Sequence, residues 1–141
     1  MTEKSFRLPW RVLPYISPSG ASDVLDYLED LKRKNRREWE RFEIVRKEME
    51  ARGPFDLGGQ YWEAVGDQLY EISWGRNRAY CSVENDRIVM MYVTVRKLWP
   101  KMRPKDRRKC LSRRADVQSR SYDLESREHL HRAHRQRRGK Q

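Results

Sequence analysis

The chain has 141 residues and a net charge of +11, and 37% of its residues are hydrophobic. A chain of this length forms one domain that needs neither a disulfide nor a structural metal to bury a core. No stretch reaches the roughly 18 apolar residues of a membrane span, and residues 1–10 lack the apolar core of a signal peptide. We therefore expect a soluble, cytoplasmic protein with no membrane partner.

The positive charge is concentrated in the last third of the chain. Residues 1–95 contain 15 Lys and Arg against 16 Asp and Glu, whereas residues 96–141 contain 17 against 5. A field of one sign favours a polyanionic partner, and nucleic acid is the most common polyanion in a cytosol. A solvated basic tail that aids solubility is the alternative, above all for the last twenty residues.

The N-terminal part of the chain predicts a short strand and two helices. Two prolines interrupt the β-favouring residues 5–15, so this segment is at best a short or edge strand. Ser22 is a suitable N-cap for a first helix, and a second begins near Asn35 and ends at residues 53–54. Because the connection is short, we expect the two helices to pack as an antiparallel hairpin. Their apolar stripes consist of Val24, Leu25, Leu28 and Leu31 in the first and Trp39, Phe42, Val45 and Met49 in the second.

The middle of the chain predicts three strands joined by short turns. Residues 69–74 alternate in polarity, residues 78–83 favour a second strand, and residues 87–95 stay apolar as far as Thr94. The last pattern is typical of a central strand that is covered on both faces. Together the three strands predict an antiparallel meander, and a mostly charged helix over residues 105–118 follows it.

These elements predict an α+β fold. The expected architecture is an N-terminal helix hairpin packed on a small antiparallel β-sheet, followed by one C-terminal basic helix. We expect a single domain over residues 1–120 and a basic, flexible tail over residues 121–141, which has too few apolar residues for a core element.

The order of the elements, together with several motifs, resembles the RelE superfamily of bacterial toxins, and most closely its phage-related HigB-type branch (host inhibition of growth). Residues 20–31, GASDVLDYLEDL, resemble the branch's G-x-x-x-V-x-x-F-L-x-x-L helix, and residues 67–74, DQLYEISW, its dG-LyELR strand. Residues 77–83, NRAYCSV, are similar to the following strand. Residues 88–106, IVMMYVTVRKLWPKMRPKD, resemble ivLLhgFvKKtqKtP. The resemblance covers roughly residues 10–120.

The resemblance implies the fold named above and a function. Proteins of this kind are toxins of type II toxin-antitoxin systems, and they act as mRNA interferases, endoribonucleases that cut translated mRNA, usually at the ribosome. A cognate antitoxin, often a helix-turn-helix DNA-binding protein, normally holds them inactive. The expected partners are therefore mRNA, the ribosome and an antitoxin.

The resemblance also implies site residues. The strand arginine of the family falls on Arg78, with Arg76 as the alternative register, and the lysine pair falls on Arg96 and Lys97. Many relatives have a histidine where this chain has Tyr92. The loop that follows is longer than in the family pattern, so its downstream lysine falls on either Lys101 or Arg103.

The chemistry of RNA cleavage assigns roles to these residues. Without a metal or cofactor, and we expect neither, cleavage needs a base for the 2′-OH, positive charge on the phosphate and an acid for the leaving 5′-oxygen. Arg78 and Arg96 supply charge only, because a guanidinium does not deprotonate in proteins. Lys97 serves as base or acid only where neighbouring cations lower its pKa, and Tyr92 shares a proton or stacks on a base. The residues expected to bind RNA are Arg76, Lys101, Arg103, Lys105, Arg107 and Arg108.

Two other classes of function fit the same sequence. The basic face could belong to a non-catalytic module that binds RNA or the ribosome, because strand aromatics and cationic helices serve binding equally well. A phage structural or DNA-packaging accessory protein is the third reading. His129, His131 and His134 lie in a polar segment, which favours a solvated or RNA-contacting tail over a metal site.

Overall fold

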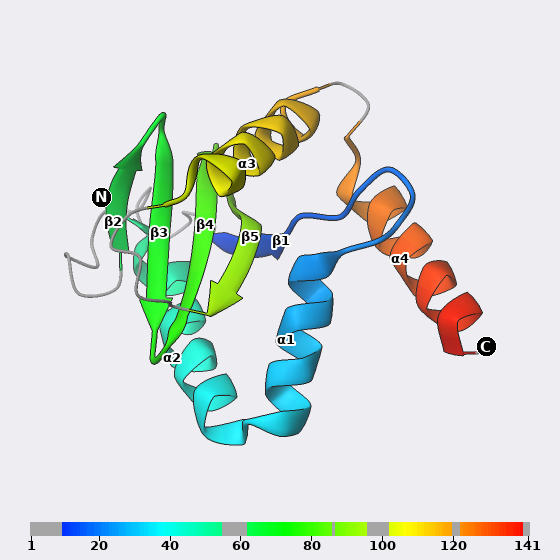
Figure 1. The fold of residues 1–141 in the computed structure, drawn as a ribbon, viewed down its shortest axis with the longest axis horizontal. Helices are drawn as coiled ribbons and strands as arrows, with labels where there is room; N and C mark the ends of the chain where they lie inside the picture. Colours follow the sequence, from blue (N-terminus) through cyan, green and yellow to red (C-terminus); the bar gives the residue numbers. More distant parts are fainter. Residues whose placement is uncertain (1–9, 55–61, 86, 96–101, 120–121, 140–141) are drawn as a thin grey trace, which may run out of the picture.

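The computed structural model describes residues 10–54, 62–85, 87–95, 102–119 and 122–139. Within these ranges one five-stranded sheet, with strand order β1-β5-β4-β3-β2, is combined with four helices (Figure 1). The elements are β1 (Arg11–Pro14), α1 (Asp23–Lys34), α2 (Arg36–Arg52), β2 (Trp62–Gly66), β3 (Leu69–Trp74), β4 (Asn77–Glu84), β5 (Arg87–Val95), α3 (Pro104–Val117) and α4 (Leu124–Gly139).

The sheet is mixed. Strands β2 to β5 are antiparallel to their neighbours, whereas β1 runs parallel to β5, with Arg11 opposite Arg87 and Pro14 opposite Met90. β5 is thus an interior strand, and helices contact it from both faces. This position explains why its sequence shows almost no polar alternation.

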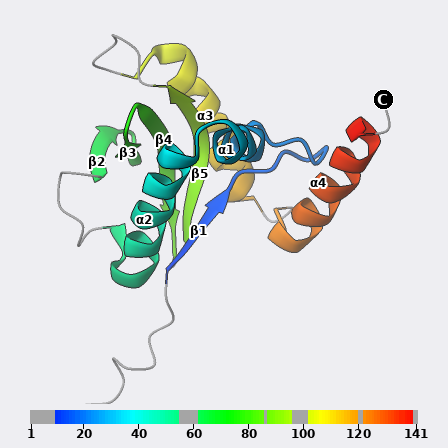
Figure 2. The same ribbon diagram turned by 90° about the horizontal axis from the view of Figure 1, so that it is seen from below.

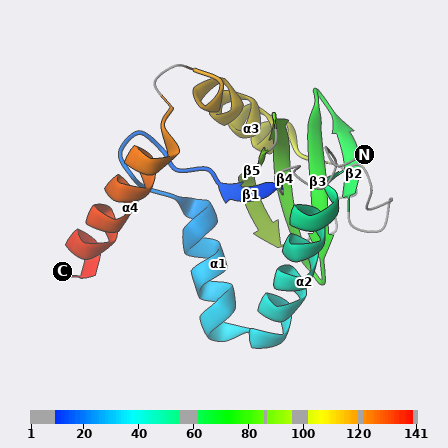
Figure 3. The ribbon, with the colours of Figure 1, turned by 180° about the vertical axis from the view of Figure 1, so that it is seen from behind.

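Helices cover both faces of the sheet. α1 and α2 lie on one face and α3 crosses the other, as the opposite views in Figures 1 and 3 and the view from below in Figure 2 show. On the first face Phe42 of α2 packs against Trp74, with the ring centroids 4.8 Å apart. On the second face Cys110 and Val117 of α3 pack with Leu69 and other side chains of the sheet.

Local signals determine where α1 and α2 begin. The Ser22 hydroxyl accepts a hydrogen bond from the Leu25 amide at 3.1 Å and donates one to the Tyr15 carbonyl at 2.7 Å. Asn35 alone separates the two helices, and its side chain caps α2 by accepting from the Glu38 amide at 3.2 Å. From this junction the two helices diverge, α1 beside β5 and α2 behind the sheet (Figure 1).

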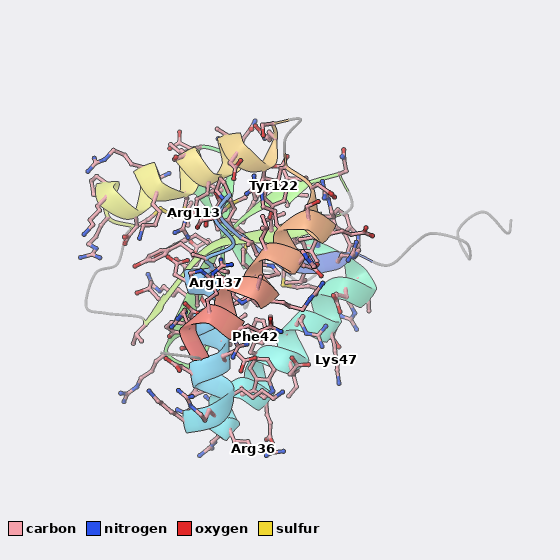
Figure 4. The ribbon with its side chains drawn as sticks, turned by 90° about the vertical axis from the view of Figure 1, so that its right-hand side faces the viewer. Arg36, Phe42, Lys47, Arg113, Tyr122 and Arg137 are labelled. Carbon is pink, nitrogen blue, oxygen red and sulfur yellow. The ribbon has the colours of Figure 1, made fainter. Side chains whose placement is uncertain are left out.

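α4 is an ordered helix that packs on the loop between β1 and α1, and two ion pairs connect it to α1. This side of the molecule faces the viewer in Figure 4. The buried Arg127 guanidinium donates to the Ile16 carbonyl at 2.8 Å. The buried His131 lies with Nδ1 2.9 Å from the Gly20 carbonyl oxygen. Leu124–Gly139 therefore form a docked helix within the segment that the sequence analysis assigns to a flexible tail.

The predicted architecture is wrong, although the chain is α+β. The sheet has five strands and a parallel pair, so it is neither small nor antiparallel. Two helices follow the sheet where one was expected, and α1 and α2 diverge instead of forming the predicted hairpin on it. The physical reason is that β1 and β2 gain their stability from pairing with distant or neighbouring strands, which their own short sequences do not reveal.

Within the described ranges, none of the helices combines the length and the apolar character that crossing a membrane would require.

Candidate functional site

Strand alternation gathers polar side chains on the sheet face that carries α3. Arg78 of β4 lies opposite Ser73 of β3 and Thr94 of β5. Its neighbour on the same face, Tyr80, lies opposite Glu71 and Tyr92 in the same two strands. Residues directly opposite each other share a face, so one patch unites side chains from three adjacent strands. Lys109 of α3 lies against this patch. We call these five residues the sheet-face cluster: Glu71, Arg78, Tyr80, Tyr92 and Lys109.

Arg78 is the buried cation of this cluster. Its exposed fraction is 7%, and its Nη1 lies 3.5 Å from Oε2 of Glu71. The other carboxylate oxygen of Glu71 accepts a hydrogen bond from the Ser73 hydroxyl at 3.1 Å. Nε of Arg78 has no hydrogen-bond partner within the described ranges. A buried guanidinium with one carboxylate and an unsatisfied donor retains unused capacity to bind an anion.

Tyr80 extends the buried part of the cluster, with an exposed fraction of 3%. Burial raises the pKa of the Tyr80 phenol above its usual value of 10, and a hydrogen bond from Arg78 partly opposes that shift. The phenol is therefore neutral at physiological pH. It supplies packing and a polar contact to Arg78, but no negative charge.

Lys109 completes the cluster from above. Its Nζ lies 4.5 Å from the centroid of the Tyr92 ring, within the range of a cation–π contact. Both side chains are half-buried. Sequence reasoning missed Lys109, although a signal was present. Lys109 follows Asp106 by three positions on α3, and Asp106 and Cys110 are both buried, so the residue borders the inward face of the helix.

The residues that the sequence analysis proposed for RNA binding fall into three groups. Arg76 lies in the turn before β4, exposed and outside the strand, so Arg78 is the strand arginine that joins the cluster. Arg103 pairs with Asp106 at 3.3 Å, and Arg107 donates to Asp67 at 2.9 Å and to the Val65 carbonyl. Lys105 and Arg108 are exposed, with no ion pair in the described part of the chain. Lys101 lies outside the described residues, as do Arg96 and Lys97, which the sequence analysis proposed as catalytic residues.

Ion pairs with acidic residues neutralise part of the positive charge of the C-terminal third. Arg113 of α3 binds both carboxylate oxygens of Asp23 at 2.8 Å, and these contacts act against its desolvation to raise the Arg113 pKa. Each of two cations of α4 pairs with an acid of α1: Arg138 with Asp26 at 3.1 Å, and Arg135 with Glu29 at 3.5 Å. The charge separation along the sequence is therefore partly cancelled by the fold.

The arrangement can bind an anion on Arg78 and offers a carboxylate and an ammonium group beside it. Among the described residues, no three His, Cys, Asp or Glu side chains are grouped so that they could hold a metal ion. No protein-family model matches the sequence, and no curated protein is significantly similar to it.

Proposed function

We propose that the protein is an endoribonuclease toxin of a type II toxin-antitoxin system, an mRNA interferase that cuts translated mRNA at the ribosome. The resemblance to the HigB-type branch of the RelE superfamily motivates this proposal. The single structural observation that supports it is the sheet-face cluster. In this cluster Arg78, a buried cation that could bind a phosphate, shares one sheet face with a carboxylate, a phenol and an amine, groups that metal-independent RNA cleavage can use.

In this proposal Arg78 and Arg96 stabilise negative charge on the phosphate in the transition state. Lys105 and Arg108, both exposed at the start of α3, hold flanking phosphates and position the RNA. The expected site of action is the cytoplasm, where translated mRNA is found. The expected regulator is a cognate antitoxin, which would cover the basic face or block access to the ribosome.

A second function is favoured by a specific observation. Arg78 and Tyr80 are buried, with exposed fractions of 7% and 3%, so a phosphate reaches Arg78 only if the site opens. Lys105, Arg108 and Arg76 are already exposed and need no such change. A non-catalytic RNA-binding or ribosome-binding module would use these exposed cations and leave the cluster as a structural element.

Induction in bacteria separates the two functions. The intact protein is expressed beside an Arg96→Ala, Lys97→Ala double variant, growth is followed, and 5′-ends of cellular mRNA are mapped. The control is an Arg37→Ala, Lys47→Ala double variant, because these two α2 cations are exposed and have no ion pair within the described ranges.

The enzyme proposal predicts growth arrest and new mRNA ends at codon intervals for the intact protein and the control. It predicts neither effect for the Arg96, Lys97 variant. Growth arrest without new ends in all three proteins would support the binding module. No effect from any of them would refute the toxin proposal.

A further inference from the structure

The sheet-face cluster has an order that follows the order of the strands. Glu71 lies on β3, Arg78 on β4, and Tyr92 with Lys109 above it on β5. Neighbouring strands are about 4.8 Å apart. A phosphate bound to Arg78 would have the Glu71 carboxylate on the β3 side, and the Lys109 ammonium group would lie diagonally across on the β5 side, because Tyr92 is opposite Tyr80 in the register.

We infer that Glu71 is the general base and Lys109 the general acid of RNA cleavage at this site. This inference rests on the proposed function and names the two proton-transfer groups that the sequence left open. Glu71 takes the proton of the 2′-OH, and the 2′-oxygen forms a bond to phosphorus. The bond from phosphorus to the 5′-oxygen breaks, and that oxygen takes a proton from the Lys109 ammonium group. The products are a 2′,3′-cyclic phosphate and a free 5′-OH.

The ion pair with Arg78 gives Glu71 a way to become active only when RNA is bound. In the free protein the carboxylate is held by Arg78 at 3.5 Å and by the Ser73 hydroxyl at 3.1 Å. Once the site opens, a phosphate that binds the buried Arg78 takes the place of Glu71, which leaves the carboxylate a free acceptor next to the substrate. The unpartnered Nε of Arg78 provides a further donor for a phosphate oxygen.

Lys109 owes its position to the Tyr92 ring. The ammonium group lies 4.5 Å from the ring centroid, so the aromatic face, and not the phenol oxygen, holds it in place. Tyr92 is then a positioning residue, in contrast to the two roles that the sequence analysis gave it, sharing a proton or stacking on a base. Tyr92→Phe should therefore keep cleavage within about threefold of wild type, whereas Tyr92→Ala should lose most of it.

The pH dependence of cleavage tests the base. The charged and titratable neighbours of Glu71 are Glu63, opposite it on β2, and Arg78 and Tyr80 on β4. Those of Lys109 are Tyr92 of β5 and, on its own helix, Asp106. Single-turnover rates are measured on ribosomes programmed with a defined mRNA, across a range of pH.

Glu71→Gln should slow cleavage by a factor on the order of 10² to 10³ and remove the acidic limb of the rate profile. Glu71→Asp, which keeps a carboxylate, should be slower than wild type but retain that limb. Glu84→Gln, further along the sheet on β4, serves as the control and should behave as wild type. An acidic limb that persists in Glu71→Gln, or is lost in Glu71→Asp, would overturn the assignment of the base.

A modified leaving group tests the acid. When a 5′-bridging sulfur replaces the leaving oxygen, the thiolate departs without a proton, so a general acid is no longer needed. Lys109→Met should slow cleavage of the normal mRNA by a factor on the order of 10² and cut the sulfur-containing mRNA at nearly the wild-type rate. Glu71→Gln should stay slow on both substrates. Lys47→Met, at an exposed lysine on α2 that has no role in the proposed site, is the control.

The possible failures are distinguishable. Suppose that the wild-type protein cleaves the normal mRNA. If Lys109→Met is then equally slow on both substrates, or as fast as wild type on both, Lys109 is not the acid, while the proposed function stands. If the wild-type protein cuts neither substrate, the proposed function fails and this inference fails with it.

Discussion

Asp116 at the end of α3 joins parts of the chain that are far apart in sequence. Its carboxylate accepts a hydrogen bond from the Tyr15 hydroxyl at 2.6 Å and two from Arg127 at 2.8 and 3.1 Å. The hydrogen bonds from Arg127 are the largest cause of the lowered pKa of Asp116, whose ordinary value is 3.8. A carboxylate with a lowered folded pKa stabilises the fold above its ordinary pKa, and that contribution is lost as pH falls through the folded value.

We expect Asp116→Asn to lower the free energy of unfolding by about 2 kcal/mol near neutral pH, because charged hydrogen bonds to Arg127 and Tyr15 are lost. The difference from wild type should shrink once the pH falls below the ordinary carboxyl pKa of 3.8. Urea unfolding at a series of pH values measures it. Asp30→Asn, which removes an exposed pair with Arg33, should cost less than about 1 kcal/mol. Equal losses in the two variants would contradict this role of Asp116.

The docking of α4 depends on a close approach at Gly20. This glycine has φ +93°, and a Cβ atom there would lie 2.6 Å from the carbonyl oxygen of Leu130 in α4. Backbone cannot move aside as a flexible side chain can. Gly66 has nearly the same φ, +92°, but a Cβ there would meet only the end of the Arg107 side chain, at 3.3 Å. A substitution at either position would therefore strain the backbone, but only one at Gly20 would also collide with α4.

We expect Gly20→Ala to push α4 from its site, with faster hydrogen exchange of the amides in residues 124–139. Gly66→Ala should cost about 1 kcal/mol of stability through its backbone conformation alone and leave exchange in α4 unchanged. Hydrogen exchange followed by mass spectrometry makes the comparison. If both variants leave α4 protected, the contact at Gly20 does not hold the helix.

At the scale of elements, local signals in the sequence predict where α1 and α2 begin. They do not predict which strands pair or where α4 docks. Ser22 and Asn35 carry their capping function within three residues, so α1 and α2 begin where the sequence indicates. The parallel pairing of β1 with β5 joins residues that are far apart in the sequence, such as Arg11 and Arg87, and no local pattern encodes it. The sequence of α4 indicates a tail because its anchors, Arg127 and His131, are polar residues that bind backbone carbonyls, and polar residues give no signal of burial. The family resemblance singled out Arg78, with Arg76 as the alternative, but only the tertiary fold brings Lys109 to the same sheet face.

For the molecule as a whole, the charge that remains free after folding matters more than the charge of the sequence. Acids of the N-terminal part pair with cations from the last third, among them Asp23 with Arg113 and Asp67 with Arg107. Lys105 and Arg108 keep their full charge at the surface. The positive field that could attract a polyanion is therefore weaker than the C-terminal composition suggests. Among the described residues of the last third, exposed cations without an ion pair are found on α3, at Lys105 and Arg108, and on α4, at Arg132 and Arg137.

We expect RNA binding to weaken with rising salt, with Lys105 and Arg108 as contributors. Removing a cation that contacts a phosphate of single-stranded RNA should reduce the slope of log affinity against log salt by about 0.7. Lys105→Ala and Arg108→Ala should each show this change in a fluorescence anisotropy titration with a short RNA. Arg107→Gln should leave the slope unchanged, because Asp67 already neutralises Arg107. A slope that responds to Arg107 and ignores Lys105 and Arg108 would place the RNA elsewhere.

The parallel pairing of β1 with β5 has a consequence for how the chain is made. Arg11 leaves the ribosome early, but its partner strand follows only after Arg87 has been synthesised. Strands β2 to β5 are antiparallel neighbours in sequence order and can pair as each emerges. The edge of the sheet at β1 therefore closes late in synthesis. Until β5 has been synthesised, β1 lacks its strand partner and β4 presents an open edge of unpaired backbone groups. This is the stage at which the nascent chain is most exposed to aggregation or to capture by a chaperone.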